Sequence, residues 1–334
     1  MKAGRKPAIF VFTTAYHPFI GGAEVAIQEV ARRLKHQFRF FIITARLKND
    51  LPFREVHPEG VVIRVGLGSG FDKWLLLLLG VVAFFRERRR LGGAALCWGM
   101  DISAGAFAAA VINTLSARIP FILTIQYGYG GRRLRKGRWG GIGKAFRWML
   151  KRACAVTAIS SYLAREAGYF GYRRPVELLP NGVAMEAFAH VRPIRGEGSP
   201  PVVVTVGRLV PKNGTDILIR AFALARKAVP NAVCHIIGDG PERASLEALA
   251  GELGVSNAVL FKGSVPYHAV PRYLAEADVF VRSSRSEGMG NAFIEALAAG
   301  LPVVGTPVEG VLDIIEDGKT GLFAAVGDAR DPLG

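Results

Sequence analysis

Four side chains in the second half of the chain have the types and spacing needed to bind a phosphorylated ligand that also carries hydroxyl groups. Arg208 and Lys212 follow the apolar run 202–206, and both residue types bind phosphate oxygens, Arg through a planar fork and Lys as a point charge. Glu287 and Glu295 are separated by seven residues, and carboxylates accept hydrogen bonds from ribose or sugar hydroxyls. The alternative is that all four are solvated charges in surface loops.

Glycines follow several apolar runs, at positions where the backbone must turn sharply or approach a ligand closely. Gly207 follows one run, and Gly238 and Gly240 lie in a second strand-to-helix turn. Gly288 and Gly290 precede a helical stretch, and the first N–H groups of a helix favour an anion. Each segment can also be a good turn and no more, with nearby acidic residues placed for the helix dipole.

The pair Glu287 and Glu295 resembles the E-x7-E element of retaining glycosyltransferases with the GT-B fold, particularly glycosyltransferase family 4. Other stretches are similar to motifs of that family and occur in the same order along the chain. They are HPFIGGAE (17–24), LPNGV (179–183), GRLVPK (207–212), GDGP (238–241), FKG (261–263) and GLPVV (300–304). Each motif is weak by itself, but the ordered set covers roughly residues 8–325 and is specific.

The resemblance implies a role for each donor-side residue. Arg208 and Lys212 would hold the diphosphate of a nucleotide sugar, with UDP or GDP as the expected nucleotide, and would stabilise its departure. Glu287 would hold the donor sugar and Glu295 the ribose hydroxyls. The remaining contacts would come from backbone groups of Gly207, Gly238, Gly263, Met289, Gly290 and Asn291.

The acceptor side of the reaction is expected in the first half of the chain. The resemblance implies that Gly21 and Gly22 let this half approach the phosphates and the acceptor. The family often has a histidine after the strand that reads Thr-x-His, where this chain has Gln126, which cannot usefully accept a proton. Asp101 is the nearest carboxylate and a candidate base, although it can instead cap the helix predicted from residue 102. His17 is the other candidate.

No metal or separate cofactor is expected. Family members transfer the sugar without a bound metal, and the sequence has no Asp-x-Asp pair and no His/Asp cluster with ligand spacing. Retention by double displacement would need a carboxylate nucleophile at the sugar. The family is instead assigned attack on the same face, with the departing phosphate assisting deprotonation.

Short apolar runs alternate with helical stretches along the chain, which predicts an α/β fold with parallel sheets covered on both faces. A Gly- and Pro-rich linker at 193–201 separates an N-terminal acceptor-side domain at 1–192 from a C-terminal donor-binding domain at 202–334. We therefore expect two doubly wound, Rossmann-like domains facing a cleft. Because family members continue for several more helices, the C-terminal end is expected to be truncated.

The charge of the chain lies almost entirely in its first half. The 334 residues have a formal net charge of +16, and residues 1–190 contain 29 of the 43 basic residues but 11 of the 27 acidic ones. Nine basic residues lie between Arg132 and Arg152, interleaved with aromatic residues. This stretch suits an anionic membrane surface. The alternatives are a solvated face over a core helix and, ranked last for want of any known motif, nucleic-acid binding.

These observations predict a metal-independent hexosyltransferase that moves a sugar from a nucleotide sugar to a lipid-linked or cell-envelope glycan acceptor. The longest apolar run, 74–85, is too short to span a bilayer, and three scattered cysteines fit a reducing compartment. We expect a cytoplasmic protein, peripheral on the inner face of the membrane. The alternative is a catalytically inactive relative that binds nucleotide sugars or anionic lipid, which the presence of Gln126 favours.

Overall fold

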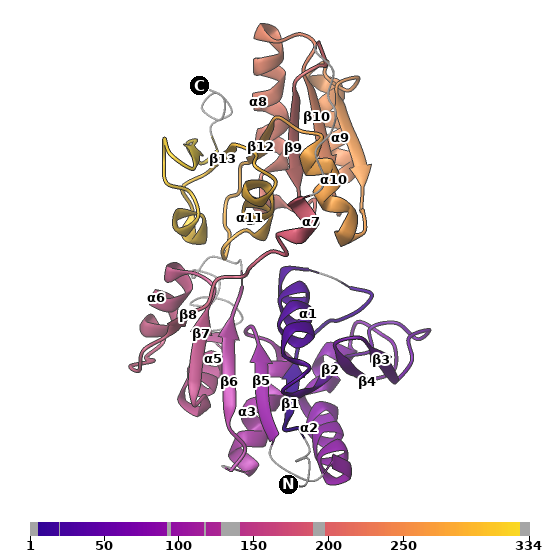
Figure 1. Cartoon of the computed structure of the whole chain (residues 1–334), viewed down its shortest axis with the longest axis vertical. Helices are drawn as coiled ribbons and strands as arrows, with labels where there is room; N and C mark the ends of the chain where they lie inside the picture. The colour runs from indigo at the N-terminus through magenta and orange to yellow at the C-terminus, as the bar shows by residue number, and fades with distance from the viewer. Residues whose placement is uncertain are drawn as a thin grey trace. The chain divides into compact units, whose positions relative to one another are not determined.

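The computed structural model describes residues 6–19, 21–91, 95–116, 118–127, 141–189 and 198–327. The chain packs as two α/β units, and Figure 1 shows its course from the N-terminus to the C-terminus. The described residues up to Pro180 form the first unit, and those from Asn181 onwards form the second.

The first unit is built on a sheet with the strand order β3-β4-β2-β1-β5-β6-β7-β8. All neighbouring strands pair in parallel except β3 and β4, which form an antiparallel hairpin at one edge. Its strands are β1 (Ala8–Phe12), β2 (Arg39–Ala45), β3 (Arg54–His57), β4 (Gly60–Val65), β5 (Ala95–Met100), β6 (Phe121–Ile125), β7 (Ala155–Ala158) and β8 (Glu177–Leu178). Its helices are α1 (Gly22–Leu34), α2 (Asp72–Leu91), α3 (Ala104–Leu115), α5 (Gly141–Arg152) and α6 (Ser161–Tyr169).

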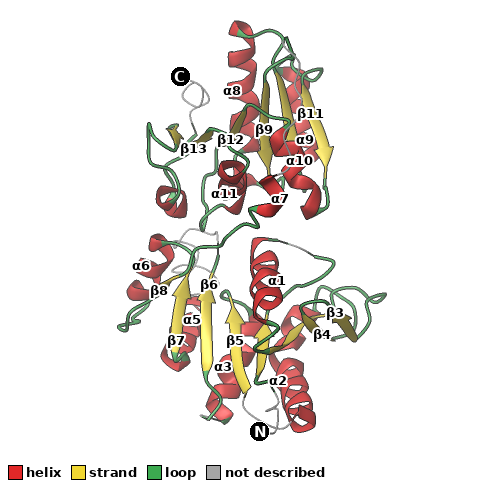
Figure 2. Cartoon of the chain, in the orientation of Figure 1, coloured by secondary structure: helices red, strands yellow, loops and turns green. Residues whose placement is uncertain are grey.

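Strand β1 is buried on both faces, as a central strand of a parallel sheet must be. Val11 packs in a core cluster with Ile27 of α1. Phe10 packs edge-on against Phe84 of α2, with ring centroids 4.7 Å apart. Successive side chains of a strand point to opposite faces, so one apolar run is covered by two helices. Figure 2 distinguishes the helices, strands and loops of each unit by colour.

The second unit contains a parallel sheet with the order β11-β10-β9-β12-β13-β14. Its strands are β9 (Val202–Val206), β10 (Val233–Ile237), β11 (Val259–Gly263), β12 (Val279–Arg282), β13 (Val303–Gly305) and β14 (Gly321–Phe323). Its helices are α7 (Glu186–Ala189), α8 (Thr215–Ala228), α9 (Arg243–Glu252), α10 (Val270–Ala275) and α11 (Asn291–Ala298), with 3-10 turns η2 (Pro211–Asn213), η3 (Tyr267–Ala269) and η4 (Glu309–Asp313). Val203 and Val204 of β9 belong to different core clusters, one on each face of the sheet.

The expected α/β class with two Rossmann-like parallel sheets is confirmed. The chain enters the second unit at Asn181, earlier than the expected boundary after residue 192. The reason is the short helix α7, whose Phe188 is buried in the second unit's core together with Val202 and Phe280. Residues 193–197 of the expected linker lie outside the described part of the chain.

Candidate functional site

The carboxylate of Glu287 lies between two cations at the carboxyl end of the second sheet. Nη2 of Arg282 donates to Oε2 of Glu287 at 2.7 Å, and Nζ of Lys212 lies 3.6 Å from Oε1. Glu287 and Arg282 are each only 8% exposed. A buried carboxylate needs such partners, because desolvation otherwise disfavours its charge.

Arg282 is a site residue that sequence reasoning missed. It is the last residue of β12, and its guanidinium also donates to the carbonyl oxygen of Val206, to Oδ1 of Asn213 and to Oγ of Ser284. The five-donor fork of Arg therefore joins the end of β9, the turn η2 and the loop that contains Glu287. In the sequence, the feature that could have indicated this residue is a single arginine directly after the apolar run 279–281.

The 3-10 turn η4 is hydrogen-bonded to the loop that contains Glu287. Oε2 of Glu309 accepts hydrogen bonds from the backbone N–H of Glu287 and from the hydroxyl of Ser286, both at 2.8 Å. The N–H of Gly310 donates to the Glu287 carbonyl at 3.2 Å, and a Cβ on Gly310 would lie 1.9 Å from the carbonyl oxygen of Gly288. Glycine is therefore required where η4 meets the loop.

Glu295 lies in α11 and is 6% exposed. Burial raises the pKa of Glu295, opposed by a hydrogen bond from Tyr267 and by the positive charge of Arg282. Arg282 therefore acts on both carboxylates of the predicted E-x7-E pair. Glu287 and Glu295 are thus both near the guanidinium of Arg282.

Lys212 and Arg208 lie on the segment that follows β9. Lys212 is in the turn η2, and its neighbour Asn213 donates from Nδ2 to the carbonyl oxygen of Arg208 at 2.6 Å. The Arg208 side chain itself is exposed. Both cations are thus positioned at the carboxyl edge of the sheet, where doubly wound folds bind ligands.

Three of the predicted glycines, Gly207, Gly238 and Gly263, end neighbouring strands side by side. Gly207 donates to the carbonyl of Ile237, and Gly238 donates to the carbonyl of Gly263. A Cβ on Gly238 would lie 2.0 Å from the carbonyl oxygen of Gly207, and one on Gly207 would lie 2.9 Å from Nη1 of Arg282. Gly207 and Gly238 are therefore needed for packing between strand ends, whereas a Cβ on Gly263 would make only an ordinary contact with Arg243, at 3.4 Å. Sequence reasoning did not distinguish this packing role from ligand contact.

The predicted residues Met289, Gly290 and Asn291 lie at the start of α11. Met289 is only 2% exposed over the whole residue, backbone included, so it presents almost no surface to a ligand. Gly290 is the N-cap with a φ of 89°, a left-handed conformation that favours glycine. Oδ1 of Asn291 accepts a hydrogen bond from Nδ2 of Asn181 at 3.0 Å.

In the first unit, the structure brings the predicted glycine pair close to Asp101. The N–H of Gly21 donates to Oε2 of Glu24 at 2.8 Å and so caps α1, which begins at Gly22. Burial raises the pKa of Glu24, and the nearby charge of Asp101 contributes to this shift. The glycine turn and Asp101 therefore share the carboxyl edge of the first sheet.

Asp101 does not cap a helix. The N-cap of α3 is Ser103, whose Oγ accepts from the N–H of Ala106 at 3.0 Å. Asp101 instead adopts a φ of 64° directly after β5. Burial raises the pKa of Asp101 to about 6, against the lowering effect of N–H groups that include that of Gln126. A carboxyl group that titrates near neutral pH suits a general base.

His17, the other candidate base, lies between β1 and α1. Its Nε2 is hydrogen-bonded to the side-chain amide of Gln28, and its ring stacks on that of His57 with centroids 4.9 Å apart. Burial, followed by the influence of His57, lowers the pKa of His17.

The described part of the basic stretch is the helix α5, and residues 132–140 lie outside the described part of the chain. Phe146, Met149 and Leu150 are buried, and Trp148 packs on Phe107. Lys144, Arg147, Lys151 and Arg152 are exposed. This half of the stretch is therefore a solvated basic face over core side chains, and its apolar residues do not face outward.

Helix α2 combines apolar and basic residues on its outer face. Phe71, Trp74, Leu78 and Val82 are 63%, 45%, 74% and 63% exposed, and they lie at the three- and four-residue spacing of one helix face. Arg86 and Arg89 continue this line and are also exposed. We call these six residues the α2 stripe. In the described residues, no helix is long and apolar enough to cross a membrane.

Two doubly wound units, with a paired-carboxylate site at the strand ends of the second, are the features of a GT-B glycosyltransferase. Residues 20–187 match the family model described as "Glycosyltransferase Family 4", and residues 189–331 match the one described as "Glycosyl transferases group 1". The chain belongs to glycosyltransferase family 4.

Curated relatives are similar over part of their length. A "GDP-mannose-dependent alpha-(1-6)-phosphatidylinositol monomannoside mannosyltransferase" of Mycolicibacterium smegmatis is 39% identical over 184 residues, covering 51% of this chain and 48% of the relative. A "Lipopolysaccharide core biosynthesis glycosyltransferase LpsE" of Rhizobium meliloti is 35% identical over 170 residues, covering 50% and 48%. These alignments span about half the length of the relatives.

Solved structures share the fold. A sucrose-phosphate synthase from Thermosynechococcus elongatus superposes with a TM-score of 0.80 at 19% identity, covering 98% of this chain and 88% of that one. Anabaena Alr3699/HepE, solved in complex with UDP and glucose, gives a TM-score of 0.73 at 19% identity with the same coverage.

Proposed function

We propose that this protein transfers a sugar, with retention of configuration, from a UDP- or GDP-sugar to a lipid-linked or cell-envelope glycan acceptor. The observation that carries the proposal is the position of Glu287 between Arg282 and Lys212, within reach of the same Arg that acts on Glu295. Carboxylates suit sugar hydroxyls and the neighbouring cations suit a diphosphate, so the site has both chemistries of a nucleotide sugar.

Transfer would rest on electrostatic stabilisation of the leaving group. As the bond from the sugar C1 to the diphosphate stretches, negative charge grows on the phosphate and the sugar becomes oxocarbenium-like. Lys212 and Arg208, at the strand edge, would stabilise that charge more strongly in the transition state than in the ground state. Both cations come from the chain itself, so we propose that the step needs no metal.

We propose that the acceptor hydroxyl attacks the sugar C1 on the same face from which the phosphate departs, rather than after a double displacement. A nucleophilic carboxylate must present an oxygen to C1, but both oxygens of Glu287 are engaged, one by Arg282 and the other near Lys212. Glu287 is therefore better suited to hold sugar hydroxyls than to attack. On the acceptor side, Asp101 is the proposed base, because its pKa of about 6 lets it take a proton near neutral pH.

A membrane-bound acceptor is supported by the α2 stripe and by the relatives. The name of the Mycolicibacterium smegmatis relative describes a phosphatidylinositol monomannoside substrate. In the first unit of this chain, three exposed apolar side chains and two arginines lie on one face of α2, and the exposed Phe71 directly precedes the helix. This arrangement suits insertion at an anionic interface. We propose on this basis that the protein acts at the cytoplasmic surface of a membrane.

The test is a screen of UDP- and GDP-sugars with the purified full chain, read by thermal shift and by release of nucleoside diphosphate. A ligand that binds only the native state raises the melting temperature. We expect one nucleotide sugar to do so and to be turned over in the presence of glycolipid. Binding without turnover would favour the inactive relative, and no binding by any member of the panel would overturn the donor assignment.

A further inference from the structure

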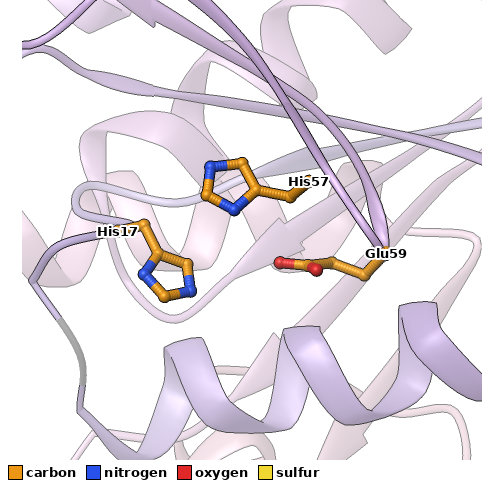
Figure 3. Close-up of side chains that lie close together, drawn as sticks. All are labelled: His17, His57 and Glu59. Atoms are coloured by element: carbon orange, nitrogen blue, oxygen red, sulfur yellow. The ribbon is translucent and has the colours of Figure 1, made fainter.

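Two histidines and a glutamate meet in the first unit, away from the residues assigned to the donor. His17 precedes the glycine turn, His57 ends β3 and Glu59 lies in the turn that leads to β4. One nitrogen from each ring and one carboxylate oxygen all lie within 4.8 Å of one another. Figure 3 shows the three side chains turned toward a common point.

The surroundings hold these side chains in place. The hydroxyl of Tyr16 donates to Oε1 of Glu59 at 2.8 Å. Nε2 of Gln28 lies within hydrogen-bond distance of Nε2 of His17, so this amide must turn away for His17 to bind a metal through that nitrogen. Oε2 of Glu55 lies 3.2 Å from Nε2 of His57, which leaves Nδ1 of that ring as its ligand atom. Outer partners of this kind orient metal-binding side chains and set their tautomers.

The charges around the cluster leave room for a cation. Arg64 lies 2.8 Å from Glu55 and donates to the carbonyl oxygen of His17 at 2.7 Å, so Glu55 already balances this arginine. In the described residues, Glu59 forms no ion pair with a lysine or arginine.

We propose that His17, His57 and Glu59 form a binding site for a divalent transition-metal ion of the zinc type. Two imidazoles and one carboxylate are a ligand set that zinc accepts, with a fourth position left for water. Ligand atoms on a tetrahedral zinc are about 3.3 Å apart, so side-chain rotations that shorten the separations from at most 4.8 Å to that value complete the site. The ion ties the segment before the glycine turn to the β3–β4 hairpin.

The experiment uses Co²⁺ as a spectroscopic probe on the untagged full chain. Cys154 is exposed and is replaced in every sample (Cys154→Ser), since a free thiol binds Co²⁺ and Zn²⁺ by itself. We expect visible absorption bands that saturate at one equivalent of Co²⁺ and disappear when Zn²⁺ is added. Zn²⁺ should also raise the melting temperature of the first unit.

Two variants and one control decide the outcome, with folding checked by circular dichroism. His57→Gln and Glu59→Gln should each weaken Co²⁺ binding at least tenfold. His268→Gln, which changes an exposed histidine of the second unit, should leave it unchanged. Bands that persist in His57→Gln, or the absence of saturable binding in the parent, would overturn the site. The readout does not use a nucleotide sugar, so it is independent of the proposed transferase activity.

Discussion

Arg282 and Glu287 form a buried ion pair in the second unit, with Nη2 and Oε2 2.7 Å apart. The pair joins the end of a strand to the loop before α11, and the same guanidinium reaches the carbonyl of Val206 and the amide of Asn213. One side chain thus positions both the carboxylate proposed to hold the sugar and the segment that contains Lys212.

The ion pair predicts a large loss of stability in the variant Arg282→Ala. Removing one partner leaves the buried carboxylate uncompensated, so the unfolding free energy should fall by about 3–5 kcal/mol. Urea unfolding measures this. Arg272→Ala removes an exposed pair with Glu276 and should cost less than about 1 kcal/mol. Similar losses in the two variants would show that the buried pair has no special role.

Lys212→Ala should separate catalysis from folding. If Lys212 stabilises the departing diphosphate, kcat should fall by about 10²–10³-fold, as when an oxyanion donor is removed. The control is Lys227→Ala, an exposed lysine in the last turn of α8, which should keep parental kcat. An unchanged kcat in Lys212→Ala would remove this residue from the site.

Asp101 predicts a pH dependence of the reaction. If it is the acceptor-side base, kcat/KM should fall as the pH drops below about 6, where its carboxylate takes up a proton. In Asp101→Asn, kcat/KM should be low and should lack this limb. A parental profile in the variant would transfer the role to another group, and His17→Gln is then the next variant to measure.

The same carboxyl group predicts an effect on stability. Its pKa is raised from 3.8 to about 6 in the folded chain, so the folded state binds the proton more tightly than the unfolded state. Asp101 therefore destabilises the fold above pH 6, by up to about 3 kcal/mol, and this penalty disappears as the pH falls toward 4. The free energies of unfolding of the parent and of Asp101→Asn should diverge as the pH rises from 4 to 6. A constant difference between them over this range would contradict the raised pKa.

The α2 stripe predicts binding to anionic vesicles. The double variant Trp74→Ser, Leu78→Ser should reduce retention at least tenfold, because burial of each large apolar side chain is worth about 1.5–3 kcal/mol. Leu312→Ser changes a half-exposed leucine of the second unit and serves as the control. Retention measured by co-sedimentation should weaken with salt. Equal retention of the parent by neutral vesicles would exclude an electrostatic contribution.

Gly238 and Gly254 provide a matched test of the packed strand ends. Both have positive φ, 138° and 68°, but a Cβ on Gly254 would meet open space whereas one on Gly238 would collide with Gly207. Gly254→Ala should lower the free energy of unfolding by about 1–2 kcal/mol because of its backbone conformation. Gly238→Ala should lower it further because of the added collision. Thermal unfolding compares them, and equal losses would mean that the strand ends can move apart.

Much of the architecture was determined by the sequence itself. The apolar run 202–206 is a strand with those bounds in the structure, because a short apolar run next to a glycine turn has few alternatives in a sheet covered on both faces. The order of the motifs likewise indicates the family from the sequence alone. The short elements β3, β8 and α7 were missed, since a few half-exposed residues produce no clear period.

Tertiary structure alone decided which side chains meet. Arg282, Asn213 and Glu309 are distant from one another in the sequence, yet all three support Glu287. The same holds for His17, which lies beside His57 and Glu59 only because β2 pairs with both β1 and β4. Local periodicity specifies an element and its buried face, whereas strand order brings the ends of separate elements together. The candidate site therefore depends on strand order, which local periodicity does not specify.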